Sequence, residues 1–384
     1  MKIADVRSHI VGNKWKNWII FEVTSDEGIS GFGEATLEHR TMGLVKTLED
    51  LKPDIIGTNI WYSNSIIEKI RRETYTPGIL INTLLAGVEA ALLDLQGKVS
   101  GLNVTQLLGG SLRPKVRVYA NGWYRVKRTP EGFSRAAQAV IDKGYTALKF
   151  DPFGSSQYTL TFQELKESLE IIRAVRETAG NGIDLIIEGH ARFYFATAYE
   201  IAKRIADFGV LWFEEPVLPY DLHGLREIIH KSPVPIGTGE RLFRLEDFRE
   251  VLECGPLAVI QPDIVHVGGL RPAQKIAALA ESFGVPVAFH NPQGPISSIE
   301  SILLSSVCPN SFIQEYFGDF DEEWTKGLIS PEICVKNGYI DVTTAPGLGI
   351  EFCRSTASQH PYNPMNRQNL FGSDWQLRKG RNVQ

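Results

Sequence analysis

The sequence predicts an α/β protein built around a (β/α)₈-type barrel of the modified TIM kind, preceded by an α+β capping domain and followed by a segment that packs back on the cap. Two patterns predict this fold. From residue 116 onward, short apolar strand-like stretches alternate with amphipathic helical stretches, which is typical of a parallel sheet with crossover helices. Before residue 116, strand patterns come first and helical patterns follow, which is typical of an α+β unit.

The capping domain begins with strands. An N-terminal strand over about residues 2–11 is expected to join a hairpin made by Trp18–Thr24 and Ile29–Glu34, whose connection reads Ser-Asp-Glu-Gly. The polar segment 13–17, with Trp15 at its centre, is expected to be a mobile loop.

Helices are expected from about residue 41 to residue 108. Apolar residues recur there at helical spacing, and Gly109-Gly110 ends the run. The residues at that spacing are Leu84, Val88, Ala91 and Leu95. We therefore predict a capping domain over residues 1–115.

Eight strand candidates follow, with helical segments between them and a reduced last helix. They are Val116–Ala120, Ala147–Phe150, Asp184–Glu188, Val210–Phe213, Val234–Gly237, Ala258–Ile260, Val285–Phe289 and Phe312–Glu315. A doubly wound open sheet would have a glycine-rich phosphate turn after its first strand, and this sequence has none. We predict a barrel over residues 116–345 and a polar, aromatic segment over 346–384 that returns to the cap.

The composition argues against nucleic acid and membranes as partners. A net charge of −5 leaves no basic surface for nucleic acid. The four cysteines lack CxxC or zinc spacing, which favours reduced thiols in a cytosolic protein. The N-terminus carries charges where a signal peptide needs an apolar core, and we expect no apolar run to reach the length of a membrane span. We expect a cytoplasmic protein with no membrane partner.

Ionisable residues end seven consecutive predicted strands, at the edge where such barrels carry their chemistry. They are Lys149, Glu188, Glu214, Glu240, Asp263, His290 and Glu315. A single Glu at a strand end is more often solvated or caps a helix, and equal spacing only restates the length of a βα repeat. Three converging carboxylates, however, would repel one another and take up protons unless a cation held them. An all-oxygen set suits Mg²⁺ or Mn²⁺ and not zinc.

The histidines leave alternatives open. His290 is either a satisfied structural histidine or a general base oriented by Asp263, one strand earlier. His190 faces the same way as Glu188, and either donates a proton to a leaving group or makes a supporting hydrogen bond. Lys149 is either a lone stabilising cation or part of a local ion pair with Asp151.

These motifs together resemble the enolase superfamily, in its mandelate racemase-like branch, over nearly the whole chain. The motifs are Glu188, Glu214-Glu215-Pro216, Gly239-Glu240, Gln261-Pro262-Asp263, Val267-Gly268-Gly269, His290 and Pro346-Gly347-Leu348-Gly349. The resemblance implies that Glu188, Glu214 and Glu240 bind Mg²⁺ and that Asp263 and His290 form a base dyad. A histidine or lysine base with Mg²⁺ on an ene-diolate is the mechanism of that superfamily.

Two departures narrow the activity that the resemblance implies. The first metal ligand is commonly Asp followed two positions later by Asn, whereas this chain has Glu188 and His190. The second strand often ends Lys-x-Lys, whose second Lys is the opposite-face base of a racemase, whereas this chain has Lys149-Phe150-Asp151. Two-base racemisation is therefore disfavoured. His190 and the runs over 119–124 and 147–154 are similar to gluconate and galactonate dehydratases, most closely the archaeal type.

The resemblance thus implies Mg²⁺-dependent dehydration of an aldonate to a 2-keto-3-deoxy acid by a commonly oligomeric enzyme. His290 would remove the C2 proton and His190 would protonate the C3 hydroxyl. Lys149 and Glu315 would assist, Glu315 only if it carries a proton. Substrate-binding candidates are Lys149, Asp151, Arg192 and Trp15, the last by closing over the sugar chain. A one-base epimerase or cycloisomerase, and a non-catalytic metal-dependent binder of acid sugars, remain alternatives.

Overall fold

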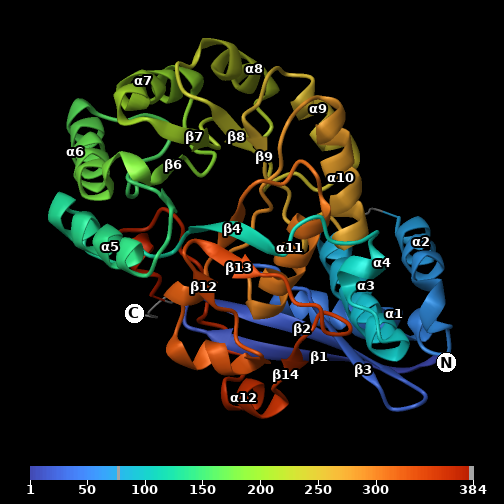
Figure 1. Cartoon of the computed structure of the whole chain (residues 1–384). Helices are drawn as coiled ribbons and strands as arrows, with labels where there is room; N and C mark the ends of the chain where they lie inside the picture. Colours follow the sequence, from blue (N-terminus) through green and yellow to red (C-terminus); the bar gives the residue numbers. More distant parts are fainter. Residues whose placement is uncertain (76–77, 380–384) are drawn as a thin grey trace.

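A computed structural model describes residues 1–75 and 78–379. The cap contains a three-stranded antiparallel sheet in the order β1-β2-β3, with helices packed against it (Figure 1). Its elements are β1 (Ile3–Asn13), β2 (Lys16–Ser25), β3 (Ser30–Glu34), α1 (Thr41–Ile55), α2 (Ser63–Glu73), α3 (Ile79–Ser100) and α4 (Val104–Leu107). The predicted order of strands before helices is confirmed.

Helix α3 forms the centre of the cap. A Cβ at Gly31 of β3 would lie 2.1 Å from the carbonyl oxygen of Ala91, so glycine is what lets the strand approach the helix this closely. The helix is long and apolar enough to cross a membrane, with a mean hydropathy of 1.5, and the expectation that no run reaches that length was wrong. However, 89% of that apolar window is buried inside the protein, as in the core helix of a globular domain.

The barrel follows the predicted alternation. Parallel strands pair in the order β4-β5-β6-β7-β8-β9, and β10 returns to pair with β4 (Figure 1). The strands are β4 (Lys115–Ala120), β5 (Ala147–Phe150), β6 (Asp184–Glu188), β7 (Val210–Glu214), β8 (Ile236–Thr238), β9 (Val259–Ile260) and β10 (Gln314–Tyr316). The helices are α5 (Pro130–Asp142), α6 (Phe162–Ala179), α7 (Phe195–Ile205), α8 (Leu222–Lys231), α9 (Leu245–Leu252), α10 (Leu270–Ser282) and α11 (Pro295–Val307).

The predicted seventh strand, Val285–Phe289, is an extended segment and not a regular strand. It makes isolated parallel bridges from Val287 to Ile260 and from Val287 to Ser311. Pro286 has no N–H to donate, so the ladder of hydrogen bonds is interrupted here. The segment nevertheless occupies its place in the barrel, and the helix after β10 is replaced by short 3₁₀ turns, in line with the predicted reduction of the last helix.

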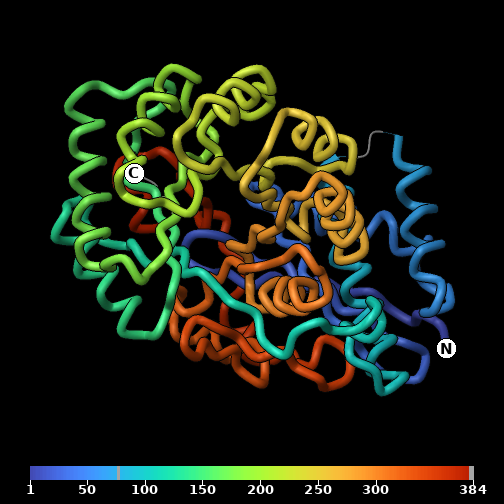
Figure 2. The backbone as a smooth tube through the Cα atoms, turned by 45° about the horizontal axis from the view of Figure 1, so that its top comes forward, coloured from blue at the N-terminus to red at the C-terminus, as the bar shows by residue number. Residues whose placement is uncertain are grey.

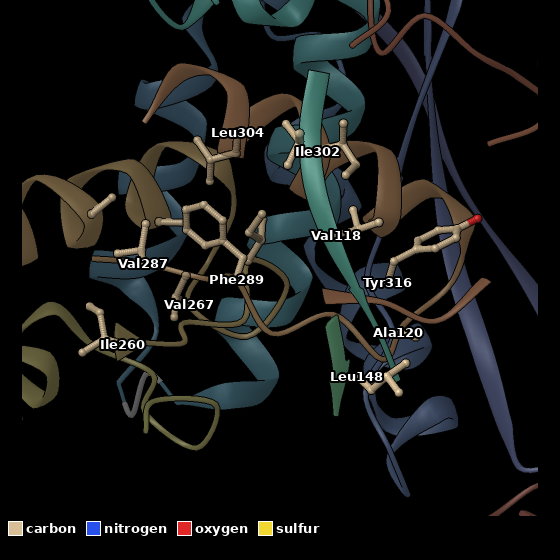
Figure 3. Close-up of a cluster of buried hydrophobic side chains, with 14 of the residues drawn as sticks. Val118, Ala120, Leu148, Ile260, Val267, Val287, Phe289, Ile302, Leu304 and Tyr316 are labelled. Carbon is tan, nitrogen blue, oxygen red and sulfur yellow. The ribbon is translucent and has the colours of Figure 1, made fainter. Parts of the chain in front are cut away.

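Two apolar layers hold the barrel together. Inside it, side chains from alternate strand positions pack on one another, as in Tyr119, Ile186, Trp212 and Ala288. Outside it, the opposite faces of the strands pack against the helices, and Figure 3 shows part of this layer. The labelled side chains include Val118, Leu148, Ile260, Phe289, Ile302 and Leu304.

The C-terminal segment has two parts, one that packs on the cap and one that packs on the barrel. Strand β14 (Glu351–Phe352) and helix α12 (Arg354–Gln359) return to the cap, where Arg354 pairs with Glu22 at 2.5 Å. Beyond them the chain turns to the barrel, and its red end in Figure 2 lies among the green segments of the barrel's first half. The expectation that the whole segment lies on the cap is therefore incomplete. The domain boundaries at residues 115 and 345 stay a prediction.

Candidate active site

A cavity of about 500 Å³ opens at the carboxyl ends of the barrel strands. All three parts of the chain contribute to its wall. The cap supplies Trp15 and Glu38, the barrel supplies Lys149, Glu188, His190, Glu240 and His290, and the C-terminal segment supplies Leu370, Trp375 and Arg378.

Three carboxylates meet on one side of this cavity. Parallel pairing sets Glu188 of β6 beside Glu214 of β7, and Glu240 follows β8. One oxygen of each lies within 4.8 Å of the other two. Burial and then the charge of Glu214 raise the pKa of Glu188 well above its ordinary value. Glu188 Oε2 is buried and accepts no hydrogen bond from the described residues.

This donor set fits a hard divalent cation. Buried carboxylates this close either share protons or share a cation, and a buried oxygen that accepts no hydrogen bond keeps its lone pairs for a metal ion. Three carboxylates with room for substrate or water oxygens match the preference of Mg²⁺ and Mn²⁺. The imidazole of His290 lies beside the cluster, with its Nε2 3.1 Å from Glu240 Oε2.

Lys149 supplies a buried positive charge beside the cluster. Its Nζ lies 2.5 Å from Glu214 Oε1, 3.4 Å from Glu188 Oε2 and 2.8 Å from Glu315 Oε1. Burial opposes this charge, but Glu214 and Glu315 raise the pKa of Lys149 well above its ordinary value. Burial is likewise outweighed at Glu315, whose pKa is lowered by Lys149 and His290. Glu315 is thus an ionised acceptor here, without the proton that donation to a substrate carboxylate would need.

His290 and Asp263 form a hydrogen-bonded pair. His290 Nδ1 lies 2.9 Å from Asp263 Oδ2, while the backbone N–H of Val265 donates to Asp263 Oδ1 at 2.9 Å. Burial works against a charge on the ring, but Glu240 and Asp263 raise the pKa of His290 to about 9. Glu240 and Asp263 therefore make His290 a stronger base than an exposed histidine, and Asp263 also fixes the ring.

A second Asp–His pair faces the same cavity. His190 Nδ1 lies 2.6 Å from Asp151 Oδ2, and Asp151 is also bound by the guanidinium of Arg192. His190 adopts a left-handed φ of 49°, and its backbone N–H donates to Glu188 Oε1 at 2.6 Å. Burial lowers the pKa of His190, with Asp151 acting in the opposite direction. Asp151 and Arg192 lie behind His190 and contact each other, and their binding of substrate stays a prediction.

Trp15 is firmly held, and the expected mobile loop is instead a tight turn between β1 and β2. The indole is 2% exposed, stacks on Phe317 at 5.7 Å and donates from Nε1 to Asp321 Oδ1 at 3.2 Å. It still lines the cavity. The sequence shows this Trp but not its partners Phe317 and Asp321, which lie far along the chain, and the turn therefore reads as a free polar loop.

Several wall residues lack any strand-end signal in the sequence. Trp375 packs edge-on against His190 at 5.2 Å, and Tyr124 follows β4. The aromatic pair Trp123-Tyr124, shortly after the end of β4, could have pointed to Tyr124 as a wall residue. Nothing in the local sequence around Trp375 or Arg378 indicates that they reach the barrel.

Two family models and several known proteins match this chain. The model of the enolase C-terminal domain-like family matches residues 132–356, and that of the mandelate racemase / muconate lactonizing enzyme N-terminal domain matches residues 7–109. D-gluconate dehydratase of Thermoproteus tenax is 34% identical over 88% of this chain and 68% of its own length. D-gluconate/D-galactonate dehydratase of Picrophilus torridus is 33% identical over 95% of this chain and 94% of its own.

Solved structures agree with these matches. A member of the enolase superfamily from Salmonella Typhimurium superposes with a TM-score of 0.88 at 29% identity, covering 94% of this chain and 98% of the other. A cap, a barrel and strand-end carboxylates in this order, matched over most of the sequence by both family models, establish the family. The chain belongs to the enolase superfamily, in its mandelate racemase / muconate lactonizing enzyme branch.

Proposed function

We propose that this protein dehydrates an aldonate, in a Mg²⁺-dependent reaction, to a 2-keto-3-deoxy acid. The observation that carries the proposal is the placement of two Asp–His pairs, His290–Asp263 and His190–Asp151, beside one cluster of three carboxylates. Loss of water from an acid sugar needs a base at C2 and an acid at the C3 hydroxyl, and these pairs supply one of each. The similarity to gluconate and galactonate dehydratases supports the same assignment.

Glu188, Glu214 and Glu240 would hold the metal ion. When bound, Mg²⁺ supplies Lewis-acid stabilisation of the negative charge that develops on the substrate carboxylate. Lys149 adds a fixed positive charge beside the cluster, and Glu315 helps to keep this ammonium in place through an ion pair at 2.8 Å. Preorganised charges of this kind stabilise a developing anion because they need no rearrangement during the reaction.

His290 is the base in this proposal. Asp263 accepts a hydrogen bond from Nδ1–H, so in the unprotonated form of the ring Nε2 carries the lone pair that takes the proton from C2. The electrons of the broken C2–H bond form a C1–C2 double bond while the π electrons of the C1–O bond move onto the carboxylate oxygen, and they return when the C1–O double bond re-forms. The electrons of the C1–C2 double bond then form the C2–C3 double bond as the C3–O bond breaks.

His190 is the acid. Asp151 stabilises its imidazolium and fixes the ring, and the leaving hydroxyl takes the imidazolium proton and departs as water. Because burial lowers the pKa of His190, its imidazolium gives up the proton more readily than that of an exposed histidine. The resulting enol becomes the 2-keto acid. A one-base epimerase would have no use for this second pair, which favours dehydration over that alternative.

A screen of the purified protein with Mg²⁺ against aldonic and aldaric acids tests the proposal, with 2-keto acid products trapped as semicarbazones. Turnover that disappears with EDTA and in His290→Asn is the expected result. Solvent deuterium entering C2 without loss of water would instead indicate the epimerase, and stoichiometric binding without exchange would indicate a binding protein. Either of these results overturns the proposed dehydration.

A further inference from the structure

Arg378 is a buried cation at the cavity, and no residue within 1–75 or 78–379 forms an ion pair with it. It is 8% exposed, and its guanidinium carbon lies 4.1 Å from the ring centre of Phe317, 5.1 Å from Trp15 and 5.6 Å from Tyr124. Aromatic faces stabilise a cation but accept no directed N–H hydrogen bond of ordinary strength. Within the described residues, no carboxylate pairs with this group and its buried Nη1 has no hydrogen-bond acceptor.

Two other cations that line the same cavity differ. Lys149 is paired with Glu214 and Glu315, while Arg241 donates to Glu215 at 2.9 Å. Leaving a buried guanidinium with unmet donors is costly, and such groups in native structures call for a ligand, an ion or a water. Burial lowers the pKa of Arg378 to about 10, so it stays a cation at neutral pH.

The backbone and the contacts around Arg378 constrain its position at the cavity. Arg378 itself has a left-handed φ of 48°, and Asp374 at the start of the same 3₁₀ turn has a φ of 56°, a conformation that non-glycine residues adopt only where surrounding contacts impose it. Trp375 supplies such a contact by donating from Nε1 to the carbonyl oxygen of Gly154 at 2.8 Å. A Cβ at residue 122 would lie 2.4 Å from Arg378 Nη1, so Gly122 leaves the space that the guanidinium occupies.

Arg378 lies across the barrel mouth from the carboxylate cluster. The cluster belongs to the ends of β6, β7 and β8, whereas Gly122 and Phe317 follow β4 and β10, which pair with each other on the opposite side of the barrel. An acid sugar whose C1 end lies at the cluster would therefore extend toward Arg378.

We propose that Arg378, supplied by the C-terminal segment, binds the oxygen atoms at the end of the acid sugar remote from the carboxylate cluster, and so selects for substrate length. This inference rests on the proposed function for the placement of the C1 end. The remote oxygens are hydroxyls in an aldonate and a carboxylate in an aldarate, and both accept hydrogen bonds from a guanidinium.

The test measures binding without turnover. In a His290→Asn background with Mg²⁺, the tryptophan fluorescence of Trp15 and Trp375 reports the dissociation constant of six-carbon and four-carbon acids. Arg378→Met should weaken binding of the six-carbon acid by roughly 10- to 100-fold, the effect of losing a charge-assisted hydrogen bond, and leave the four-carbon acid within about twofold. A larger loss for the aldarate than for the aldonate would identify the remote group as a carboxylate.

Matched variants separate contact from packing. Arg354→Met removes another arginine of the same segment, stacked on Phe32 of the cap, and should change neither constant. Arg378→Lys keeps the charge and should recover part of the loss. Equal weakening of both acids, or no weakening of either, overturns the inference. If the wild-type protein binds a six-carbon acid but releases no water, the dehydration fails while the assignment of Arg378 is still decided by the ratio of constants.

Discussion

Replacing Asp151 with asparagine should separate the two halves of the proposed reaction. Asp151 holds His190 through a 2.6 Å contact at Nδ1 and also receives the guanidinium of Arg192. Asparagine has one acceptor oxygen, and the buried Arg192 will take it, so the amide N–H₂ will face His190. The imidazolium of His190 then loses the carboxylate that stabilises it, while His290 and Asp263 are untouched.

The expected loss in the rate of dehydration follows from the contribution of His190 as a general acid. A positioned general acid contributes about 10²–10⁴-fold to a rate, so dehydration should fall by that factor, or about 2.7–5.4 kcal/mol of transition-state stabilisation. Removal of the C2 proton needs only the other pair. Solvent deuterium should therefore still enter C2 of recovered substrate at close to the wild-type rate, as measured by proton NMR alongside formation of the 2-keto acid.

Stability must be controlled in this experiment. Arg192 is 3% exposed, and leaving its charge without Asp151 should cost about 3–5 kcal/mol of folding free energy. The double variant Asp151→Asn/Arg192→Met removes the unpaired charge and should regain stability without regaining dehydration. The reasoning is refuted if Asp151→Asn dehydrates within threefold of the wild type, or if exchange and dehydration fall together in a fully folded variant.

Three further predictions concern the metal, the docking of the C-terminal segment and the cap. Mg²⁺ at a hundredfold excess over its dissociation constant should stabilise the wild type by about 2.7 kcal/mol in thermal unfolding. The variant Glu240→Gln should lose most of this stabilisation, and an unchanged stabilisation would exclude Glu240 as a ligand. Burial would raise the pKa of Glu22, but His9 and Arg354 lower it below its ordinary value of 4.5, so the contact of Glu22 with these residues stabilises the fold above that pH and is lost as the pH falls further. Glu22→Gln should therefore flatten the acid limb of a pH–stability profile. An unaltered acid limb would contradict a stabilising role for this contact. Gly31→Ala should destabilise the cap by several kcal/mol in denaturant unfolding, because its Cβ would meet the Ala91 carbonyl, and a change below 1 kcal/mol would show that α3 can move aside.

The strand-end residues could be placed from sequence because a regular βα repeat brings every strand's carboxyl end to the same edge. This repeat brings together Glu188, Glu214 and Glu240. It also brings together Asp263 and His290, which follow successive strand positions of the barrel. The extended segment at Val285–Phe289 was mistaken for a regular strand because its apolar pattern does not show the missing N–H of Pro286. Cytoplasmic location and oligomeric assembly stay predictions.

The order of strands and helices, the barrel and the carboxylate cluster were determined by the sequence alone, since hydrophobic periodicity and strand ends are local properties. Only the tertiary structure decided that Asp151 and Arg192 support His190, that Trp15 is anchored, and that Arg378 reaches the cavity. These contacts join loops far apart in the chain. They depend on left-handed backbone turns and on the path of a segment without regular structure, which no periodic pattern encodes.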